Sequence, residues 1–368
     1  MKKILFIAAH RPNRSPSQRF RFEQYFDFLK NNGFDYDISY LISEKDDKKV
    51  YSVGNYFLKL IVFIKSFIKR LKDVANADKY DIIFVQREAF MTGTVFFEKK
   101  FSRSKAKLVF DFDDSIWLSN VSDGNRNLEF LKDYSKTGKI IELSDLVIAG
   151  NRYLANYALN FNPKVKIIPT TIDTDYHKPR KQLTNEPMNQ STNPPITIGW
   201  TGTSTTLKHF ELIIPALKLL KNQYGAKICF KVIVDIPYQN SELGIVSTEW
   251  KKETEVEDLL EINIGIMPLP DNDWARGKCG FKGLQYMSLE IPTVMSPVGV
   301  NAEIINEGVN GFLANSTDEW VEKISKLISS DELRQKIGIE ARKTVIERYS
   351  VQSQKNNYLN YLKELTEK

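Results

Sequence analysis

The chain alternates short apolar, strand-like runs with helical segments, and it does so in two separate arrays. In the first array the strand-like runs cover residues 3–9, 36–42, 81–86, 107–112, 145–149 and 165–169. In the second array they cover residues 196–200, 227–234, 262–267 and 292–296. Alternation of this kind favours parallel sheets that are covered by helices on both faces. We therefore predict an α/β chain with two doubly wound parallel sheets.

A polar, proline-bearing stretch at residues 178–195 separates the two arrays and is typical of a surface linker. We expect an N-terminal Rossmann-like domain at residues 1–177 and a C-terminal Rossmann-like domain at residues 196–348. Residues from about 349 to 368 have an amphipathic pattern and predict a closing helix. A chain of 368 residues is long enough for two domains with separate cores.

The composition excludes several classes of protein. Hydrophobic residues make up 42% of the chain and aromatic residues 12%, which indicates a globular protein rather than a disordered one. Two cysteines, Cys229 and Cys279, give neither a disulfide framework nor a metal-ligand cluster, and this fits a reducing compartment. The apolar run at residues 4–9 is too short for a signal peptide. No stretch approaches the roughly 20 apolar residues of a membrane span, so we expect a cytoplasmic protein.

The formal net charge of +6 fits a mildly basic soluble enzyme, or a protein that binds anionic lipid or an acidic substrate. Nucleic acid is disfavoured, because the sequence has no zinc-finger spacing, RNP-like segment or basic recognition helix. Residues 56–72 are rich in aromatic, aliphatic and basic side chains, among them Lys65, Lys69, Arg70 and Lys72, and contain no acid. This segment fits either an interfacial helix on anionic lipid or a sheet-packing helix with a basic outer edge. The first alternative would place the protein peripherally on the inner face of the membrane.

Polar residues that follow the strands of the first array are candidate functional residues, because ligands of open α/β sheets bind at the carboxyl ends of strands. Arg19 follows the first strand and Arg87 the third. Arginine suits bidentate contacts with phosphate or carboxylate groups, although each could instead be a solvated surface charge. Asp113 and Asp114 follow the fourth strand. A carboxylate there could take a proton from a hydroxyl group, an aspartate pair could bind Mg²⁺ or Mn²⁺, and Asp114 could simply cap a helix.

In the second array, lysines and glycines gather where a strand gives way to a helix. Residues 262–285 hold a strand that ends near Pro268, a loop, and a helix that begins near Lys278. Such a junction directs backbone N–H groups and the positive end of a helix dipole toward an anionic ligand such as phosphate. Lys278, Lys282 and Gln285 lie at positions i, i+4 and i+7, so they share one helix face.

Four segments of the C-terminal half resemble the donor-binding signature of one enzyme family. They are the loop at residues 199–208, the block Gln285-Tyr286-Met287-Ser288, the strand at residues 291–296, and Asn310-Gly311-Phe312-Leu313. The pattern resembles that of retaining glycosyltransferases of family 4, within the glycosyl transferases group 1. This resemblance implies the GT-B fold, in which two Rossmann-like domains face each other across a cleft. A C-terminal helix often packs back on the first domain in such proteins.

The resemblance also implies roles for individual residues. Lys208 falls on a lysine that grips the donor diphosphate, whereas Thr203 replaces an arginine. Gly277 and Gln285 fall on the two acidic positions of the signature, and neither is acidic here, although Gln285 can still hydrogen-bond ribose hydroxyls. Asp113 falls on a histidine placed near the reacting sugar. A carboxylate there could orient an acceptor hydroxyl or stabilise a cationic sugar.

Three sets of site residues are therefore predicted. The catalytic set is Asp113, Lys208 and Lys282. The donor-binding set is Gly202, Thr203, Lys278, Gly280, Phe281 and Gln285. The set that contacts the acceptor or a phosphate is Arg19 and Arg87. No metal and no cofactor are expected, because the nucleotide-diphosphate sugar acts as a substrate.

The resemblance implies a metal-independent, hexosyltransferase-like enzyme. It would move a sugar from a nucleotide-diphosphate sugar to a glycan or lipid-linked acceptor in surface polysaccharide biosynthesis. Two alternatives stay open. A GT-B nucleotide-sugar epimerase or hydrolase would use the same donor without a glycan acceptor. A catalytically inactive sugar-nucleotide-binding partner protein would account for the loss of both acidic positions.

Overall fold

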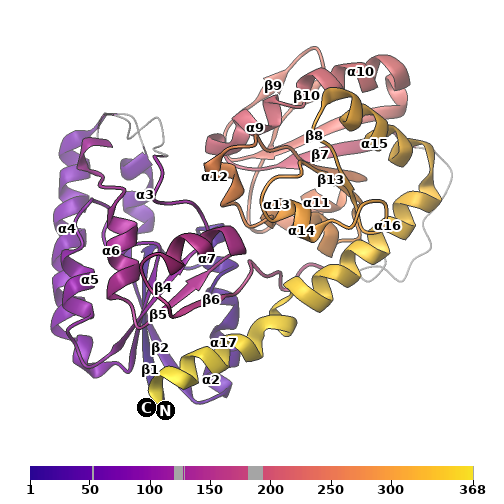
Figure 1. Cartoon of the computed structure of the whole chain (residues 1–368). Coiled ribbons are helices and arrows are strands. Elements are labelled where there is room, and N and C mark those ends of the chain that lie inside the picture. Colours follow the sequence, from indigo (N-terminus) through magenta and orange to yellow (C-terminus); the bar gives the residue numbers. More distant parts are fainter. Residues whose placement is uncertain (52–53, 120–126, 128, 181–193, 368) are drawn as a thin grey trace. The chain divides into compact units, whose positions relative to one another are not determined.

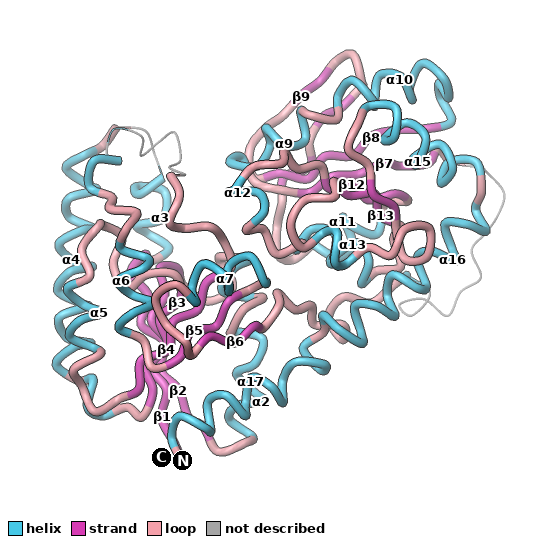
Figure 2. The backbone as a smooth tube through the Cα atoms, in the orientation of Figure 1, coloured by secondary structure: helices cyan, strands magenta, loops and turns pink. Residues whose placement is uncertain are grey.

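The computed structural model describes residues 1–51, 54–119, 127, 129–180 and 194–367. Within these ranges the chain forms two compact units, each with its own parallel sheet and surrounding helices (Figure 1, Figure 2). Unit 1 comprises Met1–Thr170 and Gln354–Lys368, and unit 2 comprises Thr171–Ser353. The predicted α/β class with two doubly wound parallel sheets is confirmed.

Unit 1 is built on a six-stranded sheet in the order β2-β1-β3-β4-β5-β6, in which every neighbouring pair is parallel. The strands are β1 (Lys2–His10), β2 (Phe34–Ile42), β3 (Ile82–Gln86), β4 (Lys107–Phe112), β5 (Leu146–Ala149) and β6 (Val165–Ile167). They lie where the apolar runs predicted them. Strands β3 and β5 are buried over their whole length, as expected for a parallel sheet with both faces covered.

The helices of unit 1 include segments from both ends of the chain. They are α1 (Pro16–Arg19), α2 (Phe26–Asn31), α3 (Glu44–Tyr51), α4 (Tyr56–Ala75), α5 (Phe96–Phe101), α6 (Lys136–Leu143), α7 (Arg152–Leu159) and most of α17 (Val351–Thr366). Tyr358 of α17 is fully buried and stacks on Tyr25, with 4.5 Å between the ring centroids. The end of the chain therefore completes the core of unit 1.

Helix α4 buries a charged side chain on the face that packs against the sheet. The guanidinium of Arg70 is fully buried and donates to the carbonyl oxygens of Ala8 at 2.8 Å and Ala89 at 2.6 Å. It also pairs with Asp73 at 2.8 Å. The prediction that Arg70 belongs to a basic outer surface is therefore wrong, because its hydrogen bonds tie α4 to β1 and to the segment after β3.

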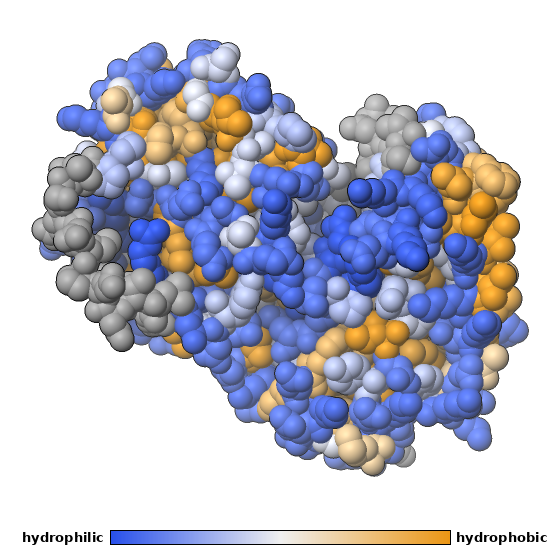
Figure 3. Space-filling model, turned by 180° about the vertical axis from the view of Figure 1, so that it is seen from behind, coloured by the Kyte–Doolittle hydropathy of each residue, from blue (hydrophilic) through white to orange (hydrophobic). Residues whose placement is uncertain are grey.

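The opposite face of α4 is apolar and exposed to solvent. The exposed large apolar side chains on it are Phe57, Leu60, Ile64, Ile68 and Leu71. They form the orange strip along the right edge of Figure 3, where α4 lies after the half-turn from Figure 1. No helix in the described ranges is both long enough and apolar enough to cross a bilayer.

Unit 2 is built on a second six-stranded sheet, in the order β11-β8-β7-β12-β13-β14, again with parallel pairs. The strands are β7 (Ile196–Thr201), β8 (Ile228–Val234), β11 (Thr248–Glu249), β12 (Ile264–Met267), β13 (Thr293–Met295) and β14 (Phe312–Leu313). A short antiparallel pair, β9 (Gln239–Asn240) and β10 (Ile245–Val246), lies outside this sheet.

Helices flank the sheet of unit 2. They are α9 (Leu207–Glu211), α10 (Ile214–Tyr224), α11 (Glu255–Leu260), α12 (Asp273–Arg276), α13 (Phe281–Ser288), α14 (Asn301–Ile304), α15 (Thr317–Ser329) and α16 (Asp331–Thr344). Apolar residues of α11 and α13, including Val256, Leu259 and Tyr286, share one buried cluster. These two helices therefore pack together on the same side of the sheet.

The boundary between the units lies before the predicted end of the N-terminal domain at residue 177. Ile172 donates its backbone N–H to Tyr349 O at 2.8 Å, and Arg342 donates to His177 O at 2.9 Å. These contacts hold the segment after Thr170 within unit 2. Of the predicted linker at 178–195, residues 181–193 lie outside the described residues.

Candidate functional site

The loop after β7 packs closely on a tryptophan near the carboxyl end of that strand. A Cβ atom at Gly202 would come within 2.2 Å of the Trp200 indole, so only glycine fits there. The backbone N–H of Gly202 donates to Ile233 O at 2.9 Å. Thr203 and Thr206 form a capping box, in which Thr203 N–H donates to Thr206 Oγ1 at 3.0 Å. The two predicted donor-binding residues of this loop are thus held in place by local contacts.

Three predicted lysines gather around one buried histidine in unit 2. Lys208 is exposed in the first turn of α9 and precedes His209, of which only 5% is exposed. Lys282 places its Nζ 5.8 Å from the ring centroid of Trp200. Burial, followed by the positive charges of Lys282, Lys278 and Lys208, lowers the pKa of His209 to about 4. The three ammonium groups therefore form one positive cluster beside a neutral imidazole.

The start of α13 depends on a glycine. Gly280 precedes the helix with a φ of +69°, a region that side-chain-bearing residues rarely adopt. A Cβ atom there would also come within 2.4 Å of Ile304 Cδ1. Phe281 is the first helical residue and is half-buried. Gly280 therefore sets the direction in which Lys282 leaves the helix start.

Gln285 is buried in a side-chain pair that the sequence did not predict. Its Nε2 donates to Oε1 of Glu255 at 3.0 Å, and each of the two residues is only 3% exposed. Glu255 begins α11, 30 residues earlier in the chain. A carboxyl group therefore lies next to a position that the family signature fills with an acid.

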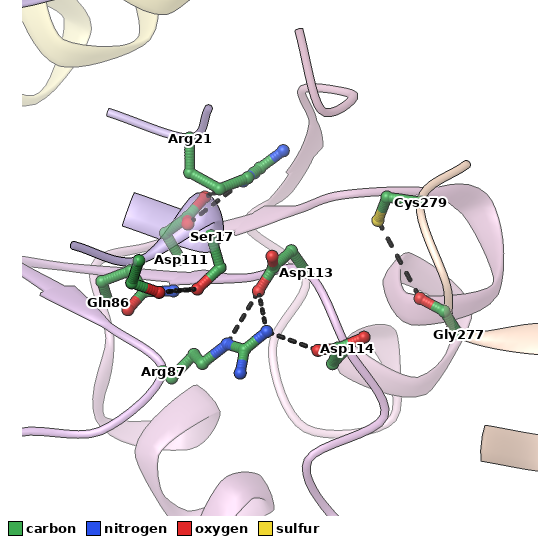
Figure 4. A network of polar contacts seen from close by, with 10 residues as sticks. Ser17, Arg21, Gln86, Arg87, Asp111, Asp113, Asp114, Gly277 and Cys279 are labelled. Atoms are coloured by element: carbon green, nitrogen blue, oxygen red, sulfur yellow. Dashed lines mark hydrogen bonds and ion pairs between the residues drawn. The ribbon is translucent and has the colours of Figure 1, made fainter. Parts of the chain in front are cut away.

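Arg87 joins the carboxyl ends of two neighbouring strands in unit 1. It follows β3 with a φ of +63°, and its Nε donates to Asp113 Oδ1 at 2.8 Å. Its Nη2 also pairs with Asp114, as Figure 4 shows. Asp113 and Asp114 follow β4, and their side chains are 12% and 13% exposed. The structure thus brings the predicted residues Arg87 and Asp113 into direct contact.

Arg87 and Asp113 change each other's pKa. Burial raises the pKa of Asp113, and the Arg87 guanidinium opposes part of that rise. Burial alone would lower the pKa of Arg87, but Asp113 and Asp114 outweigh it, so the pKa of Arg87 is raised. Arg87 therefore stays charged, while Asp113 gains a proton more readily than an ordinary aspartate.

Arg19 and Arg21 occupy buried positions near the start of the chain. Arg21 is 1% exposed and pairs with Asp111, with its Nε 3.2 Å from both carboxylate oxygens (Figure 4). Arg19 is 8% exposed, and its Cζ lies 5.0 Å from the ring centroid of Phe20. Neither is a solvated surface charge. Arg21 ties the segment after α1 to β4.

The aspartates in and after β4 have arginine partners. Asp111 is held by Arg21, and Asp113 and Asp114 are held by Arg87. Within the ranges that the structure describes, no three histidine, cysteine, aspartate or glutamate side chains are grouped to hold a metal ion.

Sequence reasoning missed three residues with unusual surroundings: His10, His209 and Glu255. The imidazole of His10, at the end of β1, stacks near Tyr51, with 3.1 Å between Nε2 and the Tyr51 hydroxyl. Burial is the main cause that lowers the pKa of His10 to about 4. The rule that polar residues at strand ends are candidates would have found His10, and His209 follows a predicted lysine directly.

Comparisons with known proteins agree with the fold. Residues 188–344 match the family model of the glycosyl transferases group 1. The chain is similar in structure to a glycosyltransferase from Rickettsia africae ESF-5, with 17% identity, a TM-score of 0.66, and coverage of 99% of this chain and 98% of that one. No curated protein matches the sequence.

Two further solved structures cover almost the whole chain. Sucrose-phosphate synthase from Thermosynechococcus elongatus has 13% identity, a TM-score of 0.68 and coverage of 99% of both chains. The Anabaena protein HepE, solved in complex with UDP and glucose, has 13% identity, a TM-score of 0.65 and coverage of 99% of both chains. The predicted resemblance to glycosyl transferases group 1 is confirmed, and the chain has the GT-B class of fold.

Proposed function

We propose that this chain is a retaining, metal-independent glycosyltransferase of family 4 that uses a nucleotide-diphosphate sugar. The observation that carries this proposal is the cluster of Lys208, Lys278 and Lys282 around His209. A diphosphate carries several negative charges, and ammonium groups that are already in place stabilise the charge that develops on a leaving diphosphate. The complex of the Anabaena relative with UDP supports a nucleotide donor.

The acceptor site is proposed at the carboxyl edge of the sheet in unit 1. Asp113 would orient the acceptor hydroxyl and take its proton, a role that suits a carboxyl group with a raised pKa. Arg87 would hold Asp113 and contact an anionic group of the acceptor. We propose a glycan or lipid-linked acceptor, with hexosyl transfer in the biosynthesis of a surface polysaccharide.

The apolar outer face of α4 supports a peripheral association with the inner, cytoplasmic face of a membrane. Its exposed apolar side chains share the helix with Lys65 and Lys72, which are also exposed. An amphipathic helix of this composition lies in the interface of an anionic bilayer, with the apolar side chains inserted and the lysines near the headgroups. Such an association would bring a lipid-linked acceptor close to the enzyme.

Donor turnover tests the main proposal. We expect Lys208→Ala and Lys282→Ala each to lower kcat/KM for the preferred sugar nucleotide about 10- to 100-fold, because each removes a charge-assisted contact to the diphosphate. The donor would be chosen by thermal shift from UDP-, GDP-, ADP- and CDP-sugars. Lys218→Ala is the matched control, because Lys218 lies on α10 in a surface ion pair with Glu242.

The fate of labelled sugar separates the proposal from its rivals. Label that appears on a glycan supports transfer, and free altered sugar would indicate an epimerase or hydrolase instead. Tight donor binding without turnover would indicate a binding protein. Unchanged turnover in both lysine variants would overturn the assignment of the diphosphate site.

A further inference from the structure

The pair formed by Glu255 and Gln285 fixes the polarity of a buried amide. Gln285 Nε2 donates to Glu255 Oε1 at 3.0 Å. The NH₂ end of the amide therefore faces Glu255, and the Oε1 end faces away. Among the described residues, no side chain or backbone group donates to this oxygen of Gln285. Gln285 is only 3% exposed. Its Oε1 is therefore a nearly buried acceptor that remains available to a ligand.

The pair lies where two helices meet at the ligand-binding edge of the sheet. Strand β11 pairs with the last residues of β8, Ile233 and Val234, and α11 begins shortly after β11 with Glu255. The apolar cluster shared by α11 and α13 holds these helices side by side. Glu255 therefore lies toward the carboxyl edge of the sheet, which is the edge where open α/β sheets bind ligands.

Lys282 of the positive cluster and Gln285 lie on one face of α13. Gln285 follows Lys282 by three residues, and residues three apart are neighbours on a helix surface. A nucleoside diphosphate whose phosphates contact Lys282 therefore extends its adjacent group, the ribose, toward Gln285. Ribose carries hydroxyl groups that can donate to an acceptor, and within the described part of the chain Gln285 Oε1 has no donor.

We propose that Glu255 is a positioning residue for recognition of the donor ribose. It orients the Gln285 amide so that the carbonyl oxygen, and not the NH₂ group, meets a ribose hydroxyl. The site thereby selects ribonucleotides over nucleotides that lack that hydroxyl. This inference rests on the proposed function, because it assumes that a nucleoside diphosphate binds at the lysine cluster.

The experiment measures how strongly the protein prefers a nucleotide with ribose over one with a deoxyribose. Full-length protein is titrated calorimetrically with UDP, GDP, ADP and CDP, and then with the 2′-deoxy and 3′-deoxy forms of the tightest ligand. We expect the ribonucleotide to bind about tenfold more tightly than one of the deoxy forms. A factor of this size corresponds to the loss of one hydrogen bond to a buried acceptor. In the Glu255→Leu variant the Gln285 amide can rotate, because its hydrogen-bond partner is gone. The ratio of the affinities for the ribonucleotide and the deoxy form should then fall to about twofold or less.

Further variants separate positioning from loss of folding. Glu257→Leu is the matched control, because Glu257 lies on the same helix and is exposed, and it should keep the wild-type ratio. The exchange Glu255→Gln with Gln285→Glu places an amide donor opposite a carboxylate again, so it should restore discrimination. Gln285→Leu removes the acceptor and should abolish discrimination even if Glu255→Leu does not fold.

The outcomes distinguish this inference from the function on which it rests. If none of the four nucleoside diphosphates binds the wild-type protein, the proposed function fails, and the ribose inference fails with it. If a nucleotide binds but Glu255→Leu or Gln285→Leu keeps the wild-type ratio, only the positioning role is overturned. Restoration by the exchange variant supports positioning, because a purely structural loss would not be reversed by swapping the two groups.

Discussion

Arg87 combines an uncommon backbone conformation with two carboxylate partners. Its φ of +63° lies in the left-handed region, which costs a residue with a side chain roughly 1–2 kcal/mol. The ion pairs with Asp113 and Asp114 offset this cost and keep two neighbouring carboxylates from repelling each other. Strain that is maintained by surrounding contacts is a feature of functional sites, and it supports the placement of the acceptor there.

Replacement of Arg87 by glutamine should destabilise unit 1 in a pH-dependent way. We expect Arg87→Gln to lower the free energy of unfolding by about 1–3 kcal/mol at pH 7, because two nearly buried carboxylates lose their cation. The loss of stability should be smaller at pH 5. The pKa of Asp113 is already raised and rises further without Arg87, so Asp113 is more often protonated at pH 5 and needs a cation less. Urea unfolding at both pH values measures this. Arg152→Gln, at an exposed position on α7, should show no such pH dependence.

His209 should make stability fall in mild acid. Its pKa is lowered from 6.5 to about 4 in the fold, so between these values the unfolded chain binds a proton that the folded protein does not. The stabilising contribution is complete above pH 6.5 and is lost as the pH falls toward 4. From pH 7 to pH 5, this single group should cost about 2 kcal/mol.

Denaturant unfolding of wild type and His209→Gln at pH 7 and pH 5 measures this contribution. The variant should lose less stability between the two pH values than wild type does. The remaining slope would include His10, whose pKa is lowered in the same direction. Equal slopes for the two proteins would contradict the prediction.

Local spacing predicted some of the site residues, and contacts between distant segments account for the rest. Lys282 and Gln285 lie on one helix as the spacing predicted. The prediction that Lys278 shares their helix face is wrong, because α13 begins only at Phe281 and Gly280 breaks the helix before it. Glu255 could not be found in this way, because 30 residues separate it from Gln285. Arg70 was placed wrongly from the composition of its segment. Whether a basic side chain points outward depends on which helix face meets the sheet, and composition carries no such information.

At the scale of the element, α4 is apolar on the side that faces water. Three changes on that face, Phe57→Ser, Ile64→Ser and Ile68→Ser, should together weaken binding to vesicles that contain anionic lipid by more than about tenfold. Lys65→Glu with Lys72→Glu should weaken binding to anionic vesicles and leave the weak binding to neutral vesicles unchanged. Vesicle co-sedimentation measures both effects.

The matched control for α4 is Leu219→Ser, which changes an exposed leucine in unit 2. It should bind vesicles as wild type does. A wild-type protein that sediments with neither kind of vesicle would overturn the proposed association. Arg70 is left unchanged in this test, because its loss would disturb the packing of α4 rather than its outer surface.

The six strands of unit 1 and the four longer strands of unit 2 were predictable from the sequence, whereas the two-residue strands β11 and β14 and the surroundings of helices were not. Parallel strands covered on both faces are largely apolar, so β3 and β5 stand out as nearly continuous apolar runs. The pattern of α4 fits two environments, because an apolar face can meet either a sheet or a lipid surface. Only the packing around Arg70 decides which face of α4 is inside.

At the scale of the whole molecule, unit 1 depends on residues from the end of the chain. Tyr358→Ala should destabilise unit 1 by about 3–5 kcal/mol, because the ring is fully buried against Tyr25. Within the described part of the chain, the hydroxyl of Tyr358 is buried without a hydrogen-bond partner. Tyr358→Phe should therefore be neutral or stabilising.

Hydrogen exchange resolved by segment tests this, because it reports on each unit separately. Tyr358→Ala should increase exchange in β1 and β3 and leave β7 and β12 unchanged. Asn360→Ala, an exposed position on the same helix, is the control. A uniform increase over both units would show that the chain unfolds as a single cooperative block.

The division into two arrays was predictable, but its boundary was not. The polar stretch at 178–195 suggested a linker after residue 177, whereas the segment after Thr170 is held in unit 2 by Tyr349 and Arg342. These partners lie far along the chain: Arg342 follows His177 by 165 residues. No local signal in the sequence marks such a contact.

Unit 1 is made of two stretches that leave the ribosome far apart in time. Gln354–Lys368 emerge only after the whole of Thr171–Ser353 has been synthesised. Until then, the nascent first stretch lacks Tyr358 and so lacks part of its interior. Unit 2, which is encoded within unit 1, can therefore be the first to finish folding during translation, and unit 1 must wait for the codons of α17.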